Sequence, residues 1–193
     1  MQYDDECEER EYHSLNADTI VGYLEETGSF ASFFDHYEER PSQLDLVRAI
    51  THCFNDNAIG VFEAGISLPG EMMALHDIIQ PTIGVFTTLG TAHQENFPSV
   101  EAKCKEKLKL FHDTLAIVYS LDAEMMNSCL AGYDYKGEKL SWSEKDENAA
   151  FYIKSIDKKD VETTIDYIWK GKTEGQYKLP FIDEASVENS ITC

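Results

Sequence analysis

The feature that most restricts the fold is an alternation of short apolar runs with helix-patterned segments from Asn57 to Gly132. The apolar runs are "AIGVFEA" (58–64), "TIGVFTTLG" (82–90) and "TLAIVYS" (114–120). The helical segments that separate and follow them are "PGEMMALHDIIQ", "SVEAKCKEKLKLF" and "DAEMMNSCLAG". Short runs almost free of charge are typical of strands covered on both faces. The alternation therefore predicts an α/β fold with right-handed crossovers, a mostly parallel sheet and flanking helices.

Apolar periodicity predicts which face of two of these helices is buried. The expected buried positions are Met72, Leu75, Ile78 and Ile79 in the first helix, and Val100, Cys104, Leu108 and Phe111 in the second. The lysines of the second helix flank or oppose its apolar face, and Lys107 lies on the flank, where a side chain can be partly sheltered.

The last third of the chain changes character. The segments "KLSWSE", "AAFYIKSID", "VETTIDYIWKG" and "GQYKLPFID" are rich in aromatic and β-branched residues and are separated by polar turns. This pattern predicts antiparallel strands attached to one edge of the parallel sheet.

The first part of the chain is expected to be helical and acidic. Helix signals occur in "NADTIVGYLEETG", "SFASFFDHYEER" and "PSQLDLVRAITHCF", with Asn16 as a cap and Pro41 at a first helical position. We expect this helical N-terminal segment to span residues 1–55 and the α/β core to span 56–193.

The formal net charge is −20, and residues 1–40 hold twelve acidic side chains against only Arg10 and Arg40. Phosphate binding needs clustered Lys and Arg, so we expect no nucleic-acid partner and no anionic membrane surface. The acidic segment is expected to be a solvated tail.

The start "MQYDDECEER" has neither the basic residues nor the apolar stretch of a signal peptide, and we expect no membrane insertion. The five scattered cysteines form no CxxC pair, which favours a reducing, cytoplasmic location.

Two polar groups fall at strand ends, where parallel sheets bind ligands. Glu63 ends the first predicted strand, and residues 87–93, ending in His93, follow the second. Together they suggest a metal or phosphate site. The alternatives, a helix cap or surface group for Glu63 and a solvated loop histidine, stay open on spacing alone.

A resemblance adds to this interpretation. The segments "FEAGISLPGEM", "IIQPTIGVFTTLGTAHQENF", "KCKEKLKLF", "DTLAIVYSLDAEMMNSCLAG", "LSWSEKDENAAFYI" and "LPFIDEASVENSITC" resemble, in order, the central domain of the Mur ligases. The similarity covers roughly residues 56–193. It points to the type that adds D-alanyl-D-alanine, especially the form fused to an alanine racemase, so a fused or associated racemase domain is an implied partner.

The resemblance implies an ATP-dependent ligase that uses Mg²⁺ and acts on a UDP-muramyl-peptide and D-alanyl-D-alanine. Glu63 then matches a magnesium ligand, His93 the family histidine near a second metal, and Lys107 the lysine that reacts with carbon dioxide. Magnesium prefers oxygen ligands, which a carbamylated lysine supplies.

The chain also departs from the family pattern. No glycine-rich loop ending in Gly-Lys-Thr or Gly-Lys-Ser precedes the matched region, so ATP binding is in doubt. Ser42 and Gln43 match substrate-binding positions, but Pro41 replaces the asparagine before them. Thr88 replaces an asparagine at a nucleotide-binding position. Asn189 matches another, although the sequence ends at Cys193, before the family's C-terminal domain.

Three functions remain open. The chain is part of a D-alanyl-D-alanine-adding ligase in peptidoglycan synthesis, and inactive alone; or a catalytically dead relative that serves as a binding or scaffold module; or an unrelated small-molecule-binding α/β protein. Loss of the phosphate loop separates the first two.

Overall fold

The computed structural model describes residues 14–33 and 36–193. The chain divides into two compact units, Met1–Glu63 and Ala64–Cys193. The predicted boundary between residues 55 and 56 stays a prediction. No helix in the described part of the chain is long and apolar enough to cross a membrane.

The described part of the first unit is helical. It contains α1 (Ala17–Leu24), a short 3-10 helix η1 (Phe30–Phe33) and α2 (Pro41–Asn55). The Asn16 side chain accepts a 2.9 Å bond from the backbone N–H of Thr19 and caps α1. The Asn55 side-chain amide exchanges two 2.8 Å bonds with the backbone of Leu15, which ties the end of α2 to the start of α1.

The predicted strand over residues 58–64 does not form. Residues 58–67, all described, have no regular secondary structure, and Ile59 and Val61 are 94% and 87% exposed. The apolar run has strand propensity, but a strand needs a neighbouring ladder to satisfy its backbone N–H and C=O groups. This segment has none.

The second unit is built on a six-stranded sheet whose strand order follows the chain. The strands are β1 (Ile83–Phe86), β2 (Ala116–Ser120), β3 (Glu138–Ser143), β4 (Phe151–Lys159), β5 (Glu162–Trp169) and β6 (Thr173–Leu179). The pairings from β1 to β4 are parallel, and those from β4 to β6 are antiparallel. The predicted mixed α/β sheet is therefore confirmed.

One strand direction differs from the prediction. β3 was expected in the antiparallel group, yet it pairs in parallel with β2 along five positions. The end of β3 then pairs in parallel with the start of β4 at only two positions, Trp142 with Phe151 and Ser143 with Tyr152. The switch to antiparallel pairing comes one strand later than the change in composition.

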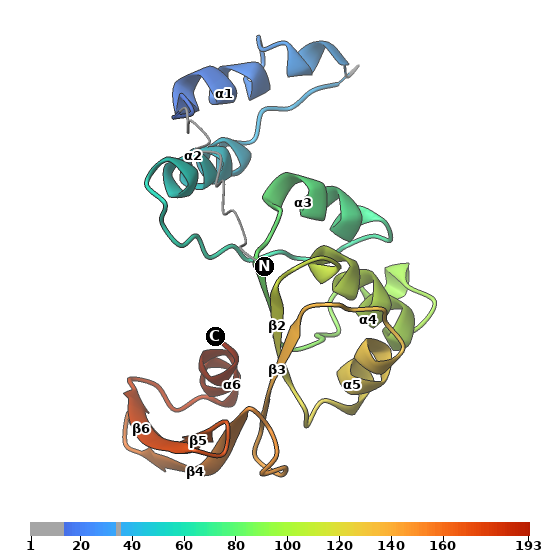
Figure 1. Cartoon of the computed structure of the whole chain (residues 1–193). Helices are drawn as coiled ribbons and strands as arrows, with labels where there is room; N and C mark the ends of the chain where they lie inside the picture. The colour runs from blue at the N-terminus through green and yellow to red at the C-terminus, as the bar shows by residue number, and fades with distance from the viewer. Residues whose placement is uncertain (1–13, 34–35) are drawn as a thin grey trace, which may run out of the picture. The chain divides into compact units, whose positions relative to one another are not determined.

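Helices cover both faces of the sheet in this unit. They are α3 (Glu71–Ile79), η2 (Gln94–Asn96), α4 (Val100–Leu108), η3 (Lys109–Phe111), α5 (Glu124–Ala131) and α6 (Glu184–Thr192). α4 and α5 lie on one side of β2 and β3, and α6 lies on the other (Figure 1). One apolar cluster gathers Met72, Phe86, Cys104, Leu108, Ile117 and Met126, and a second gathers Trp142, Ile153, Ile165, Leu179, Val187 and Ile191.

The buried face of α3 is rotated relative to the predicted one. Met72 and His76 are buried, whereas Ile78 is 63% exposed. Positions four apart share one helix face, so burial of Met72 brings His76 inward. In α4, Cys104 and Leu108 are buried as expected, but Lys103 and Glu106 are buried as well, at 3% and 5% exposure.

Glu106 joins α4 to the start of α3. Its carboxylate accepts a 2.7 Å bond from the backbone N–H of Gly70, the residue that caps α3, and pairs with Lys109 Nζ at 2.6 Å. Burial works to raise the pKa of Glu106, but the bonds from Lys109 and Gly70 outweigh it and hold this pKa below 4.5. The folded protein therefore favours the ionised carboxylate.

We expect Glu106→Gln to lower the free energy of unfolding at neutral pH by about 1–2 kcal/mol, because a charge-assisted bond to a buried group is lost. Since the folded-state pKa is lowered, the contribution is present above pH 4.5 and fades as the pH falls through the folded-state value. Urea unfolding of both proteins at several pH values measures this difference. A difference that grows toward low pH would contradict the assignment.

Glu101→Gln is the matched control on the same helix. Its side chain is 57% exposed and pairs with Lys105 at 2.6 Å. We expect Glu101→Gln to leave the free energy of unfolding almost unchanged, as is usual for exposed ion pairs.

Candidate functional site

The loop after β1 is held by two lysines of α4. Lys103 Nζ donates to the carbonyl oxygen of Gly90 at 2.7 Å and also to that of Ala92. One turn later, Lys107 Nζ donates to the carbonyl oxygen of Thr88 at 3.2 Å and lies 5.1 Å from the centre of the Phe86 ring. The loop that ends in His93 is thus held by hydrogen bonds from one helix, α4.

The structure brings some of the predicted site residues together. Thr88 and His93 belong to the loop at the carboxyl end of β1, as the sequence predicted, and Lys107 contacts Thr88 directly. His93 is exposed and has a left-handed backbone with φ 58°. Glu63 is exposed and is the last residue of the first unit, whereas this loop belongs to the second unit. The role of Glu63 as a ligand stays a prediction.

The remaining predicted positions lie elsewhere in their units. Ser42 and Gln43 are exposed in the first turn of α2, in the first unit. Asn189 is exposed in the middle of α6, in the second unit. Their proposed roles stay predictions.

The charge around the β1 loop decides which ion suits it. Lys103 and Lys107 both direct ammonium groups at this loop, and ammonium groups attract phosphate oxygens and repel a divalent cation. At this loop Lys107 suits Mg²⁺ only if it carries a carbamate, which replaces a positive charge by oxygen ligands.

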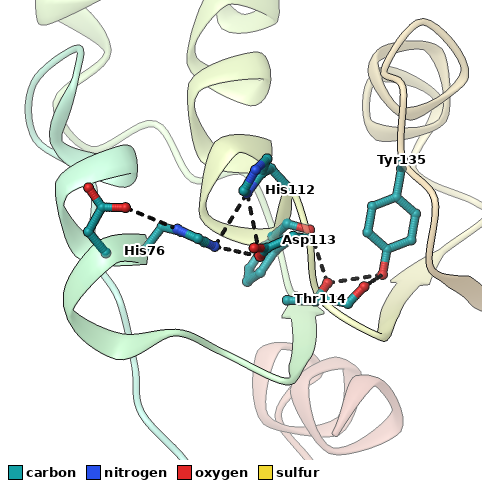
Figure 2. A network of polar contacts seen from close by, with 7 residues as sticks. His76, His112, Asp113, Thr114 and Tyr135 are labelled. Carbon is teal, nitrogen blue, oxygen red and sulfur yellow. Dashed lines mark hydrogen bonds and ion pairs between the residues drawn. The ribbon is translucent and has the colours of Figure 1, made fainter.

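A second polar cluster was not anticipated from the sequence. His76 on α3 meets His112 and Asp113 in the turn between η3 and β2 (Figure 2). His76 Nε2 lies 2.6 Å from Asp113 Oδ1 and 3.3 Å from His112 Nδ1, and His112 Nδ1 lies 3.4 Å from Asp113 Oδ1. Asp77 Oδ1 is 3.4 Å from the other ring nitrogen of His76.

The contacts in this cluster shift the pKa values of His76 and Asp113. The hydrogen bond to Asp113 raises the pKa of His76 above its ordinary value, although burial acts in the opposite direction. The same bond lowers the pKa of the Asp113 carboxyl. The sequence holds only separate local signals for the members of this cluster: His76 follows Met72 by four positions, and "HD" immediately precedes the third apolar run.

Comparison with known proteins decides the family. The model of the Mur ligase middle domain matches residues 14–193, nearly the whole chain. The chain belongs to the Mur ligase middle-domain family. The resemblance in the sequence of residues 56–193 is thereby confirmed.

A curated Mur ligase shows the same relationship. The UDP-N-acetylmuramoyl-tripeptide–D-alanyl-D-alanine ligase of Borreliella burgdorferi is 25% identical over 158 residues, which cover 79% of this chain. The match covers 32% of that ligase, so the chain spans about a third of the length of this relative.

Solved structures share the fold. The MurF ligase of Thermotoga maritima in complex with ADP aligns with a TM-score of 0.54 and 18% identity, over 65% of this chain and 29% of that one. A mutant of FPGS from L. casei aligns with a TM-score of 0.60 and 14% identity, over 85% of this chain and 39% of that one. At these identities the likeness establishes the Mur-ligase-like fold alone.

Lys103→Met is expected to loosen the β1 loop of this middle domain. The substitution leaves the carbonyls of Gly90 and Ala92 without their buried donor, which should cost about 1–3 kcal/mol of stability. Amide hydrogen exchange of residues 88–93 should become faster, as measured by mass spectrometry. Lys105→Met, at an exposed position of the same helix, should leave that exchange unchanged. Equal exchange in both variants would refute the role of Lys103.

Proposed function

We propose that this chain is a middle-domain part of an ATP-dependent ligase that joins D-alanyl-D-alanine to UDP-N-acetylmuramoyl-tripeptide in peptidoglycan synthesis. Membership in the Mur ligase middle-domain family carries the proposal. The similarity to the Borreliella burgdorferi ligase, whose name states these two substrates, supports the choice of reaction.

In this proposal the β1 loop and α4 form the phosphate and metal side of the site. Bound Mg²⁺ would stabilise charge that develops on phosphate oxygens during acyl transfer. Glu63, His93 and carbamylated Lys107 would hold the ion. The bond from Lys107 to the Thr88 carbonyl supports the roles of Lys107 as ligand and Thr88 at the nucleotide, because it already places this lysine at the loop.

The remaining assignments follow the family match. Asn189 is proposed to contact the nucleotide, and Ser42 and Gln43 the muramyl-peptide substrate. An alanine racemase domain, fused or associated, is a proposed partner. A reaction of this kind on soluble nucleotide precursors fits a cytoplasmic setting.

The sequence lacks the phosphate-loop pattern that ATP binding in this proposal would need. A phosphate loop has the pattern Gly-x-x-x-x-Gly-Lys-Ser/Thr between a strand and a helix. In the triplet Gly171-Lys172-Thr173, the first two residues lie in the turn between β5 and β6 and Thr173 begins β6. Asp166 stands where the pattern needs its first glycine. A hairpin turn offers no helix N-terminus to a phosphate, so this triplet does not replace the loop.

The second candidate is a catalytically dead relative that serves as a binding or scaffold module. The missing phosphate-loop pattern is the observation that favours it. The two candidates differ in one measurable respect, because only a domain adapted to the ligase reaction needs the metal ligands and the carbamylated lysine.

The chain alone is expected to show no ligase turnover. Without the backbone donors and lysine of a phosphate loop, it should bind ATP poorly. Incubation with ATP, Mg²⁺, UDP-muramyl-tripeptide and D-alanyl-D-alanine should therefore release no ADP above a protein-free control. Release that depends on both substrates would overturn this expectation.

Weak Mg²⁺ binding is expected, and it should strengthen when bicarbonate is supplied, because carbamylation turns Lys107 into an oxygen ligand. Isothermal titration calorimetry of the full chain measures both effects. Glu63→Ala, His93→Ala and Lys107→Ala should each weaken binding, and Lys107→Ala should also abolish the bicarbonate effect. The control Glu147→Ala, at an exposed position, should behave as wild type. Mg²⁺ binding that none of the three variants changes would favour the dead module.

A further inference from the structure

The cluster of His76, His112 and Asp113 lies at the opposite end of the parallel strands from the β1 loop. His112 and Asp113 precede β2, whereas Thr88 and His93 follow β1. β1 and β2 run in parallel, so the start of one strand and the end of its neighbour lie at opposite ends of the strands. The cluster is therefore separate from the site of the proposed ligase function.

We propose that His76, His112 and Asp113 form a binding site for a divalent transition metal of the zinc class. The three groups offer one ligand atom each: His76 Nε2, His112 Nδ1 and Asp113 Oδ1. Two imidazole nitrogens and one carboxylate oxygen are a common protein ligand set for Zn²⁺. Mg²⁺, which prefers oxygen ligands, is disfavoured because two of the three ligand atoms here are imidazole nitrogens.

The separations of the three atoms suit such an ion. Zn²⁺ binds these ligands at about 2.0–2.2 Å, so neighbouring ligand atoms of a tetrahedral site lie about 3.3 Å apart. Two of the separations, 3.3 and 3.4 Å, have this value, and the third is 2.6 Å. A point about 0.8 Å out of the plane of the three atoms lies about 2.0 Å from each, the Zn–N distance. In an ideal tetrahedral site the separation of His76 Nε2 and Asp113 Oδ1 would increase by about 0.7 Å from its present 2.6 Å.

Supporting contacts fix the ligands. Asp77 Oδ1 faces His76 Nδ1 at 3.4 Å, and a carboxylate behind a histidine favours the proton on Nδ1 and leaves Nε2 for a metal. The turn that carries the other two ligands is fixed by Thr114. Its hydroxyl donates to the Phe111 carbonyl at 3.0 Å, and the Tyr135 hydroxyl donates to the Thr114 carbonyl at 3.0 Å (Figure 2).

The site is open on one side. The His76 side chain is 9% exposed, whereas those of His112 and Asp113 are 42% and 61% exposed. His76 and Asp113 line a surface depression together with Gln80 and Thr82. Three protein ligands and an accessible fourth position are the arrangement of a site that also binds water or an external ligand.

Metal binding here would join two elements that are far apart in the sequence. His76 lies in the last turn of α3, and Asp113 lies three residues before β2. An ion bound to the folded state and not to the unfolded chain raises stability according to its concentration and affinity. A bound ion would therefore link α3 to the turn that precedes β2.

Titration of ZnCl₂ into the untagged full chain by calorimetry tests the proposal, with Co²⁺ absorption as the second readout. We expect one ion per chain and a Co²⁺ spectrum of tetrahedral intensity. His112→Ala and Asp113→Asn, both at partly exposed positions, should each weaken binding at least about tenfold and abolish that spectrum. Circular dichroism verifies that both variants remain folded.

His52→Ala is the matched control. His52 Nδ1 lies 2.8 Å from Asp56 Oδ2 on the exposed side of α2, so it is a His–Asp pair that belongs to no three-residue cluster of metal-ligand side chains in the described part of the chain. Its loss should leave Zn²⁺ affinity unchanged. Absence of saturable binding in the wild type, or equal affinity in wild type and the His112→Ala and Asp113→Asn variants, would overturn the proposal. Neither result bears on Mg²⁺ binding through Glu63, His93 and Lys107.

Discussion

Helix α4 buries two charged side chains, and each is bonded to the main chain of a different neighbouring segment. Glu106 accepts from the start of α3, and Lys103 donates to the loop after β1. A buried charge without partners would cost several kcal/mol, so these bonds fix the rotation of the helix about its axis. The position of Lys107 follows from that rotation, because it stands one turn beyond Lys103 and must face the same loop.

The sequence predicted the features that depend on local pattern. The mixed α/β class, the cap at Asn16 and a strand within residues 82–90, of which 83–86 form β1, needed only periodicity and strong local signals. The strand at 58–64 and the direction of β3 could not be predicted in this way. Apolar composition shows that a segment can pair, but the choice of a partner and its direction depends on residues distant in the chain.

The candidate sites differ in the same respect. His93 and Lys107 were predicted as site residues from a family pattern, and their roles stay predictions. His76 and His112 are 36 residues apart, and no pattern links them. Their meeting results from burial of Met72, which turns α3 so that His76 faces the turn before β2. Such a juxtaposition is a property of tertiary packing.

β3 and β4 pair at only two positions, so the parallel strands and the antiparallel hairpins of the second unit share few backbone hydrogen bonds. The second apolar cluster joins Trp142 of β3 to residues of the hairpins and of α6, and Trp142 Nε1 donates to Thr192 Oγ1 of α6 at 3.0 Å. Elements linked by few bonds open as separate cooperative units. The antiparallel hairpins are therefore the part of the sheet most able to detach while the parallel strands remain folded.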